Sequence, residues 1–128
     1  YTPPFWLLDP PDSNHRPLWI VWIGAALGIF KSLLWPHAPK VFTAALCLLL
    51  GWAVVGDVVR LAPAMGTASI VLLVTGGLIY SMGAVVYARK RPDPVPAVFG
   101  YHEIFHALVI IASICHFVCV VLIVRRAG

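Results

Sequence analysis

The chain has 128 residues, of which 61% are apolar and 11% are charged, and a formal net charge of +4. Its mean hydropathy is +0.93. Soluble domains average about 25% charged and about 45–50% apolar residues, so this composition excludes an ordinary soluble protein. It also excludes a disordered chain, and the three cysteines are too few for a disulfide scaffold. The basic residues occupy short breaks between apolar runs, which is typical of a membrane protein, and we expect no nucleic-acid partner.

The first segment, residues 1–16, contains four prolines and two aspartates. This content predicts an irregular surface segment that carries an aromatic patch at Phe5 and Trp6. The chain opens at Tyr1 without a methionine, and no signal-peptide pattern is visible. We therefore expect either a processed chain or part of a longer protein.

Four apolar runs follow, each long enough to cross or nearly cross a hydrocarbon core of about 30 Å. The predicted spans are residues 18–35, 41–59, 67–88 and 104–124. Asp57 and Arg60 mark the end of the second span and, at a spacing of three, could pair on one helix face. The predicted fold class is thus an all-α membrane protein, with residues 17–128 forming a domain of four transmembrane helices.

The distribution of basic residues predicts how these spans are oriented. With four antiparallel spans, the loops at 36–40 and 89–101 share one side of the membrane. Lys and Arg number five on that side and four on the other: Lys31, Lys40, Arg89, Lys90 and Arg91 against Arg16, Arg60, Arg125 and Arg126. The dense cluster at 89–91 strengthens this small difference. By the positive-inside rule, both loops are predicted to be cytoplasmic and the C-terminus to lie outside.

The third span carries several small residues, namely Gly76, Gly77, Ser81 and Gly83. Small side chains allow membrane helices to approach closely. We therefore expect close packing on this side of the span, the alternative being that these are ordinary glycines of a membrane helix.

Two histidines, His102 and His106, stand at the beginning of the last span. Four residues apart on a helix, they differ by about 40° in azimuth and by about one turn in height. Two imidazoles so placed can ligate one metal ion from a single face. Ionisable residues at membrane depth are costly and are usually functional. The alternative is that both rings lie at the interface and bond to loop carbonyls.

The same segment satisfies H-E-x-x-H, the zinc-protease pattern in which the glutamate is the general base. A catalytic zinc ion needs three protein ligands. The next histidine, His116, lies about 15 Å further along the helix than His106, too far to share the ion. We therefore do not expect Glu103 to act as a protease base. His116, inside the span, is expected to bond a neighbouring helix or to line a polar cavity.

Four motifs occur in order along the second half of the chain: Gly76–Tyr87 (GGLIYSMGAVVY), Lys90-Arg91-Pro92, Phe99–His106 (FGYHEIFH) and Cys115-His116-Phe117. Together they resemble the C-terminal part of the hemolysin III family, which belongs to the progestin and adipoQ receptor superfamily. Tyr1-Thr2-Pro3 is similar to the end of that family's third helix.

This resemblance implies that the chain is a fragment of a seven-helix bundle, with residues 1–16 as the end of a preceding helix and its loop. It also implies a zinc ion near the cytoplasmic face, held by three histidines. The family's H-x-x-x-H motif matches His102 and His106. The third histidine and a nearby aspartate belong to upstream helices that this sequence does not contain. Asp57 is predicted to lie at the opposite face, so the zinc site in this chain is expected to be incomplete.

For function, the resemblance implies a zinc-dependent intramembrane lipid amide hydrolase similar to ceramidases. The alternative is a non-enzymatic membrane receptor, or a cytolytic hemolysin-type protein, with a structural zinc ion. The spans have no polar stripe, which disfavours a pore. The expected partners are membrane lipid, a lipid substrate or ligand, and the missing N-terminal helices of the same protein. The expected location is the plasma or inner cell membrane, as a multi-pass protein.

Overall fold

The computed structural model describes residues 2–9, 15–37, 39–95 and 98–127. Within these ranges the secondary structure is helical, which confirms the predicted all-α class, and a β-bridge joins Val95 to Phe99 in the loop before the last helix. The helices are α1 (Thr2–Leu8), α2 (Arg16–Leu34), α3 (Lys40–Ala53), α4 (Val55–Met65), α5 (Thr67–Arg89) and α6 (Tyr101–Ala127).

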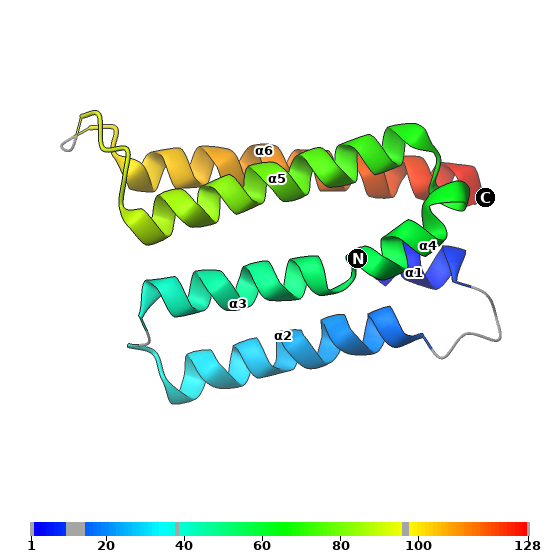
Figure 1. The fold of residues 1–128 in the computed structure, drawn as a ribbon, viewed down its shortest axis with the longest axis horizontal. Coiled ribbons are helices and arrows are strands. Elements are labelled where there is room, and N and C mark those ends of the chain that lie inside the picture. Colours follow the sequence, from blue (N-terminus) through cyan, green and yellow to red (C-terminus); the bar gives the residue numbers. More distant parts are fainter. Residues whose placement is uncertain (1, 10–14, 38, 96–97, 128) are drawn as a thin grey trace.

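The long helices run side by side, as Figure 1 shows. Helix α5 packs most extensively on α6, while α3 contacts α5 on one side and α2 on the other. The α2–α3 and α5–α6 connections lie at one end of the bundle, and the α4–α5 turn and the C-terminus lie at the other (Figure 1). Gly66 makes the α4–α5 turn with a φ of +80°, a conformation that favours glycine.

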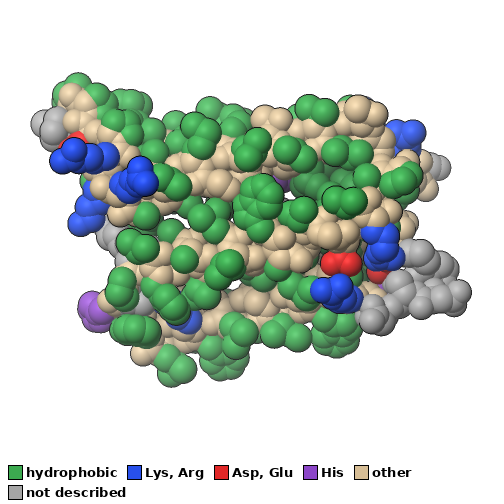
Figure 2. Space-filling model, viewed as in Figure 1, with side chains coloured by type: hydrophobic (Ala, Val, Ile, Leu, Met, Phe, Trp, Pro, Cys, Tyr) green, Lys and Arg blue, Asp and Glu red, His purple; other side chains and the backbone are tan. Residues whose placement is uncertain are grey.

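Three helices, α2, α5 and α6, are long and apolar enough to cross a membrane. The pair α3 and α4 passes the same test if its two members, bent by 44° at a short break, form one span. The fold is therefore that of a multi-pass membrane protein. Figure 2 shows apolar side chains over most of the visible face, including the sides of the helices, as expected of surfaces that contact lipid.

The second predicted span, 41–59, differs from the observed helices in two ways. Val54, with φ −93° and ψ 2°, interrupts it between α3 and α4, and α4 continues to Met65 with Pro63 inside the helix. Glycines at 51 and 56 flank the break, and glycine weakens a helix. Asp57 and Arg60 do not mark a helix end but lie inside α4, where Asp57 is buried and Arg60 pairs with Asp9, the residue after α1.

The expectation of an irregular surface segment at 1–16 is wrong for Thr2–Leu8, which forms α1. Pro3 and Pro4 are accommodated because they stand in the first turn, where their missing N–H groups have no helical acceptor. Only 1% of Phe5 is exposed, although Trp6 is largely exposed. The part of the predicted irregular segment at residues 10–14 lies outside the described residues. Helix α1 packs on α6, and it also contacts α2 and α4.

The buried core lies where α1 meets α4 and α6. Its fully buried members include Phe5, Val54 and Ile123, and the cluster is completed by Leu18, Leu61, Met65 and Cys119. The close packing expected of the small residues in α5 is found at two of the four positions. A Cβ atom at Gly76 would lie 3.1 Å from the His116 ring, and one at Gly83 would lie 3.4 Å from Leu108 on α6. Gly77 faces open space instead.

Candidate metal centre

Helix α6 begins at a well-defined N-terminus. Its first helical hydrogen bond runs from the Ile104 N–H to the Gly100 carbonyl at 3.2 Å, so Gly100 is the N-cap residue. The Gly100 N–H donates to Oε2 of Glu103 at 2.9 Å, and the Tyr101 N–H donates to Oδ1 of Asp93 at 3.2 Å. Two of the N–H groups that a helix start leaves without an acceptor are thus bonded to carboxylates.

His102 and His106 stand on successive turns just inside this N-terminus, and both are exposed. Their Nε2 atoms are 3.1 Å apart, and the rings, with centroids 4.5 Å apart, are nearly perpendicular. Two nitrogen ligands at about 2.0–2.1 Å from a tetrahedral zinc ion lie about 3.3 Å apart. The structure therefore brings the two predicted ligands together, at a separation of 3.1 Å that is close to this value. Without a metal, the same spacing allows one ring to donate to the other.

Phe105 supports this histidine pair from the side of α5. Its ring centroid lies 5.3 Å from that of His106 and 6.5 Å from that of His102. On its other side it contacts the Tyr87 ring of α5, at 4.8 Å. Since α5 and α6 form the most extensive helix contact of the fold, the pair is attached to the most extensively packed part of the bundle.

The described part of the chain brings no group of three His, Cys, Asp or Glu side chains close enough to hold a metal ion. His116 packs against Gly76 of α5, well down the helix from the pair. Asp57 is buried in the first turn of α4. Glu103, the middle residue of the H-E-x-x-H match, uses a carboxylate oxygen to cap its own helix. Among the described residues, the two imidazoles are thus brought together without a third metal-ligating side chain beside them.

A cavity of about 500 Å³ lies among α2, α3, α4, α5 and α6. Apolar side chains dominate its lining, and its polar groups include Tyr80, Ser81, Ser113 and His116. Inside the cavity wall, the Trp52 Nε1–H donates to the Ser81 hydroxyl at 3.2 Å, and that hydroxyl donates to the Gly77 carbonyl at 2.7 Å. The sequence predicted that His116 would either bond a neighbouring helix or line a polar cavity, and in the structure it lines this largely apolar one. The sequence did not reveal the contact between Trp52 and Ser81, which are 29 residues apart and lie on different helices.

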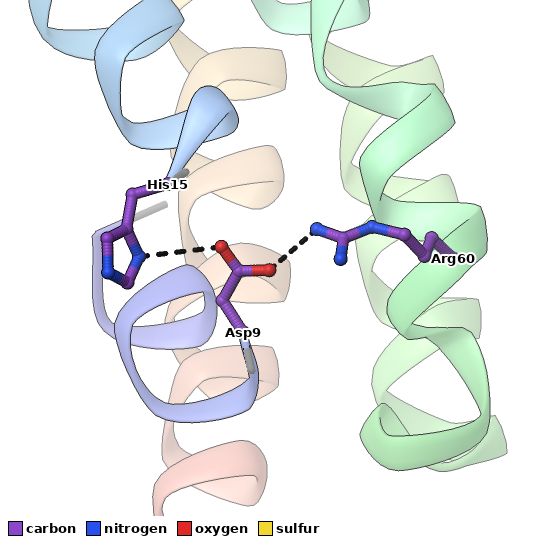
Figure 3. Close-up of polar contacts among 3 residues, drawn as sticks. All are labelled: Asp9, His15 and Arg60. Carbon is purple, nitrogen blue, oxygen red and sulfur yellow. Dashed lines mark hydrogen bonds and ion pairs between the residues drawn. The ribbon is translucent and has the colours of Figure 1, made fainter. Parts of the chain in front are cut away.

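A second polar cluster lies near the end of the bundle that carries the α4–α5 turn, and Figure 3 draws it. The Asp9 side chain is 0% exposed, and its Oδ1 accepts from Nη2 of Arg60 on α4 at 2.6 Å. Its Oδ2 lies 3.5 Å from Nδ1 of His15, just before α2. Asp57 and Arg60 therefore do not form the pair that their spacing allowed: Arg60 binds the carboxylate of Asp9, which directly follows α1, and so ties the end of α1 to α4.

These features define a class: an all-helical, multi-pass membrane protein with a histidine pair on the first two turns of α6. Residues 1–117 match the family model described as "Haemolysin-III related", so the chain belongs to the hemolysin III family. It is 30% identical to a "Hemolysin-3 homolog" of Bacillus subtilis over 122 residues, which cover 94% of this chain and 54% of the relative.

A second relative is an "ADIPOR-like receptor IZH2" of Saccharomyces cerevisiae, 41% identical over 46 residues, which cover 32% of this chain and 14% of that protein. The chain thus spans about half the length of the bacterial relative and a smaller part of the yeast one. No solved structure matches the chain significantly.

Proposed function

We propose that His102 and His106 are two ligands of a zinc ion, and that the complete protein is a zinc-dependent hydrolase of lipid amides within the membrane. The observation that carries the metal site is the 3.1 Å separation of the two Nε2 atoms. A third protein ligand, a histidine, comes from helices upstream of this sequence. This completion is required because catalytic zinc sites generally use three protein ligands and keep one position open.

The chemistry that zinc supplies in such a site is polarisation of a carbonyl group and activation of water near neutral pH. The contribution of this chain is to present two imidazoles from one rigid helix. The rings lie on an exposed face of α6, which leaves room for an upstream helix to approach. In this proposal both loops at that end of the bundle are cytoplasmic, and the C-terminus lies outside.

The cavity supports an apolar substrate, since its volume of about 500 Å³ falls within the range of about 300–1,000 Å³ usual for ligand sites. Ser113 on α6 contributes to its lining. Ser113 follows His106 by two helical turns, about 10 Å along the axis, on nearly the same face. A long chain lying along this face can therefore extend from the histidine pair to the cavity.

A second candidate function is a receptor with a structural zinc ion, and the name of the yeast relative, "ADIPOR-like receptor IZH2", favours it. The name of the Bacillus relative raises a third, cytolytic role of the hemolysin type. The same histidine pair would hold the metal in either case. The three candidates differ in whether a lipid amide is consumed.

The test is to purify the full-length protein and to measure its zinc content together with its release of fatty acid from a long-chain ceramide. We expect the wild type to hold zinc and hydrolyse ceramide. His102→Ala should lose the metal and more than about 100-fold of the activity, because even partners behind a ligand cost about 10–100-fold. His37→Ala, which removes a histidine from the exposed α2–α3 loop, is the matched control and should keep both properties.

A wild-type protein that holds zinc without hydrolysing ceramide would contradict the hydrolase and favour a receptor or structural role. A wild type without zinc would contradict the metal site itself. A further pair of variants tests the cavity: Ala62 lines it, whereas Ala64 is exposed and outside it. Ala62→Phe should slow ceramide turnover while zinc content is retained, and Ala64→Phe should leave both unchanged.

A further inference from the structure

Two carboxylates, that of Asp93 in the loop before α6 and that of Glu103 in its first turn, make contacts that the proposed metal chemistry does not use. Oε2 of Glu103 accepts the Gly100 N–H at 2.9 Å, and Oδ1 of Asp93 accepts the Tyr101 N–H at 3.2 Å. These are the N–H groups of the N-cap and first residues of α6, which have no acceptor within the helix. A glutamate that reaches back three residues in this way forms half of a capping box.

The other half of a capping box, a Ser or Thr side chain at the N-cap, is missing because Gly100 occupies that position. The reason for glycine lies in its surroundings. A Cβ atom at Gly100 would overlap Oδ1 of Asp93 and would lie 3.4 Å from Oε2 of Glu103. Both carboxylates thus approach the helix start through the space that a side chain at residue 100 would occupy.

We propose that the Glu103 and Asp93 carboxylates are positioning groups, which cap the first turn of α6 and thereby hold the histidine pair in register for a metal ion. The inference rests on the metal site proposed above. His102 is the second residue of α6, and His106 lies one turn later. The terminal turns of a helix unwind first, so the helical conformation of His102, in the first turn of α6, depends on the hydrogen bonds that hold that turn. If the turn unwinds, the two Nε2 atoms no longer lie 3.1 Å apart.

This role distinguishes Glu103 from the base of a zinc protease and from a zinc ligand. The Oε2 atom is engaged by a backbone N–H at the helix start. Along the helix, Glu103 is rotated by about 100° from His102 and by about 60° from His106. The negatively charged carboxylates also complement the partial positive charge at the N-terminus of α6, beside which the histidine pair lies.

The test compares three variants of the full-length protein. Glu103→Ala removes the acceptor, Glu103→Gln keeps an acceptor oxygen but removes the charge, and Gly100→Ala displaces both carboxylates. Zinc affinity is measured by competition with a zinc-binding dye, and the ligand set by the visible spectrum of bound Co²⁺. Hydrogen exchange at residues 100–103 is measured in metal-free protein, with His37→Ala as the control.

We expect Glu103→Ala and Gly100→Ala to weaken zinc binding about tenfold, at the low end of the effects of partners behind the ligands, without shifting the Co²⁺ bands. The same variants should exchange faster at the start of α6. Glu103→Gln should remain within about threefold of the wild type, because glutamine also serves in a capping box.

Equal weakening by Glu103→Gln and Glu103→Ala, or a shift of the Co²⁺ bands in either, would overturn the positioning role in favour of a ligand. Unchanged affinity and exchange in Glu103→Ala would overturn it altogether. Failure of the metal site gives a different result: His102→Ala would then bind zinc as the wild type does, while the exchange measurement would still report whether the cap exists.

Discussion

At the scale of the residue, the carboxylate of Asp9 is the most constrained charge in the described part of the chain. It is fully buried, and it contacts Arg60 at 2.6 Å and His15 at 3.5 Å. Arg60 is 47% exposed in its side chain, so the pair lies at the edge of the bundle and only one partner is fully desolvated. The cost of losing Arg60 is therefore carried mainly by Asp9, which would keep a buried charge with a weaker partner.

Replacing Arg60 by Gln should lower the stability of the protein by about 2 kcal/mol, between the values for exposed and for buried pairs. Thermal unfolding of the purified protein in detergent measures this loss. Arg89→Gln, which changes an exposed arginine at the other end of the bundle, should have little effect. If Asp9→Asn fully restored the stability of the Arg60 variant, the buried charge that Arg60 no longer compensates would be the cause. An Arg60 variant as stable as the wild type would contradict this interpretation.

The sequence predicts some of these residue contacts and misses others, depending on how far apart the partners lie along the chain. His102 and His106 stand on one helix, so their approach follows from a spacing of four and from helix geometry. Asp9 and Arg60 are 51 residues apart, and their pairing depends on how α1 docks on the bundle. The spacing of Asp57 and Arg60 suggested a local pair, but Asp57 is buried and Arg60 binds the distant carboxylate of Asp9.

At the scale of the element, hydropathy locates the long helices because the length and apolar content of a span are local properties. The runs at 67–88 and 104–124 correspond to α5 and α6 within a few residues. The break at Val54 is harder to predict, because it occurs inside an uninterrupted apolar run and only the glycines at 51 and 56 accompany it. The composition of residues 1–16 did not indicate helix α1, because its prolines look like loop residues unless they are recognised as the first turn of a helix, whereas the family resemblance had implied the end of a helix there.

The contact between α5 and α6 gives a prediction with a built-in control. Gly76 and Gly77 are neighbours in α5, but a Cβ atom at Gly76 would lie 3.1 Å from the His116 ring and 3.2 Å from the Ala112 carbonyl. At Gly77 it would meet nothing within 4 Å. Gly76→Ala should therefore destabilise the protein by about 1–2 kcal/mol through overpacking. Gly77→Ala should be neutral or stabilising by up to about 1 kcal/mol, because alanine favours the helix.

The two alanine variants are compared by thermal unfolding under identical conditions. We expect Gly76→Ala to unfold at a lower temperature than Gly77→Ala. Equal stability would mean that the His116 ring moves aside without cost, which would contradict the expectation that α5 is closely packed on α6 at Gly76.

At the scale of the whole molecule, Figure 1 places the α2–α3 and α5–α6 connections together at one end of the bundle. Five Lys and Arg residues belong to that end by sequence, and four belong to the other. Because such a small difference decides the orientation under the positive-inside rule, the cluster at 89–91 should control it. A reporter enzyme active only outside the cytoplasm should be active when fused to the C-terminus and silent when inserted after residue 93.

Changing Arg89, Lys90 and Arg91 together to alanine leaves two basic residues at that end against four at the other. A substantial fraction of the chains should then insert with the opposite orientation, and the C-terminal reporter should lose activity in proportion. A C-terminal reporter that is silent in the wild type would show the orientation to be reversed.

The arrangement of helices relative to one another, and with it the cavity, could not be predicted from the sequence, because no local pattern specifies which helices become neighbours.

The 44° bend between α3 and α4 has a consequence for the interior of the protein. Residues on both sides of the joint, including Gly51, Val54 and Val55, form part of the wall of the hollow beside it. A straight helix would fill space that the bent pair leaves open, so the bend angle and the cavity volume are geometrically linked. A break in a helix can leave backbone groups without helical partners, and a bilayer tolerates such groups only when they are shielded from its acyl chains. The break between α3 and α4 and the cavity beside it are thus parts of one structural feature.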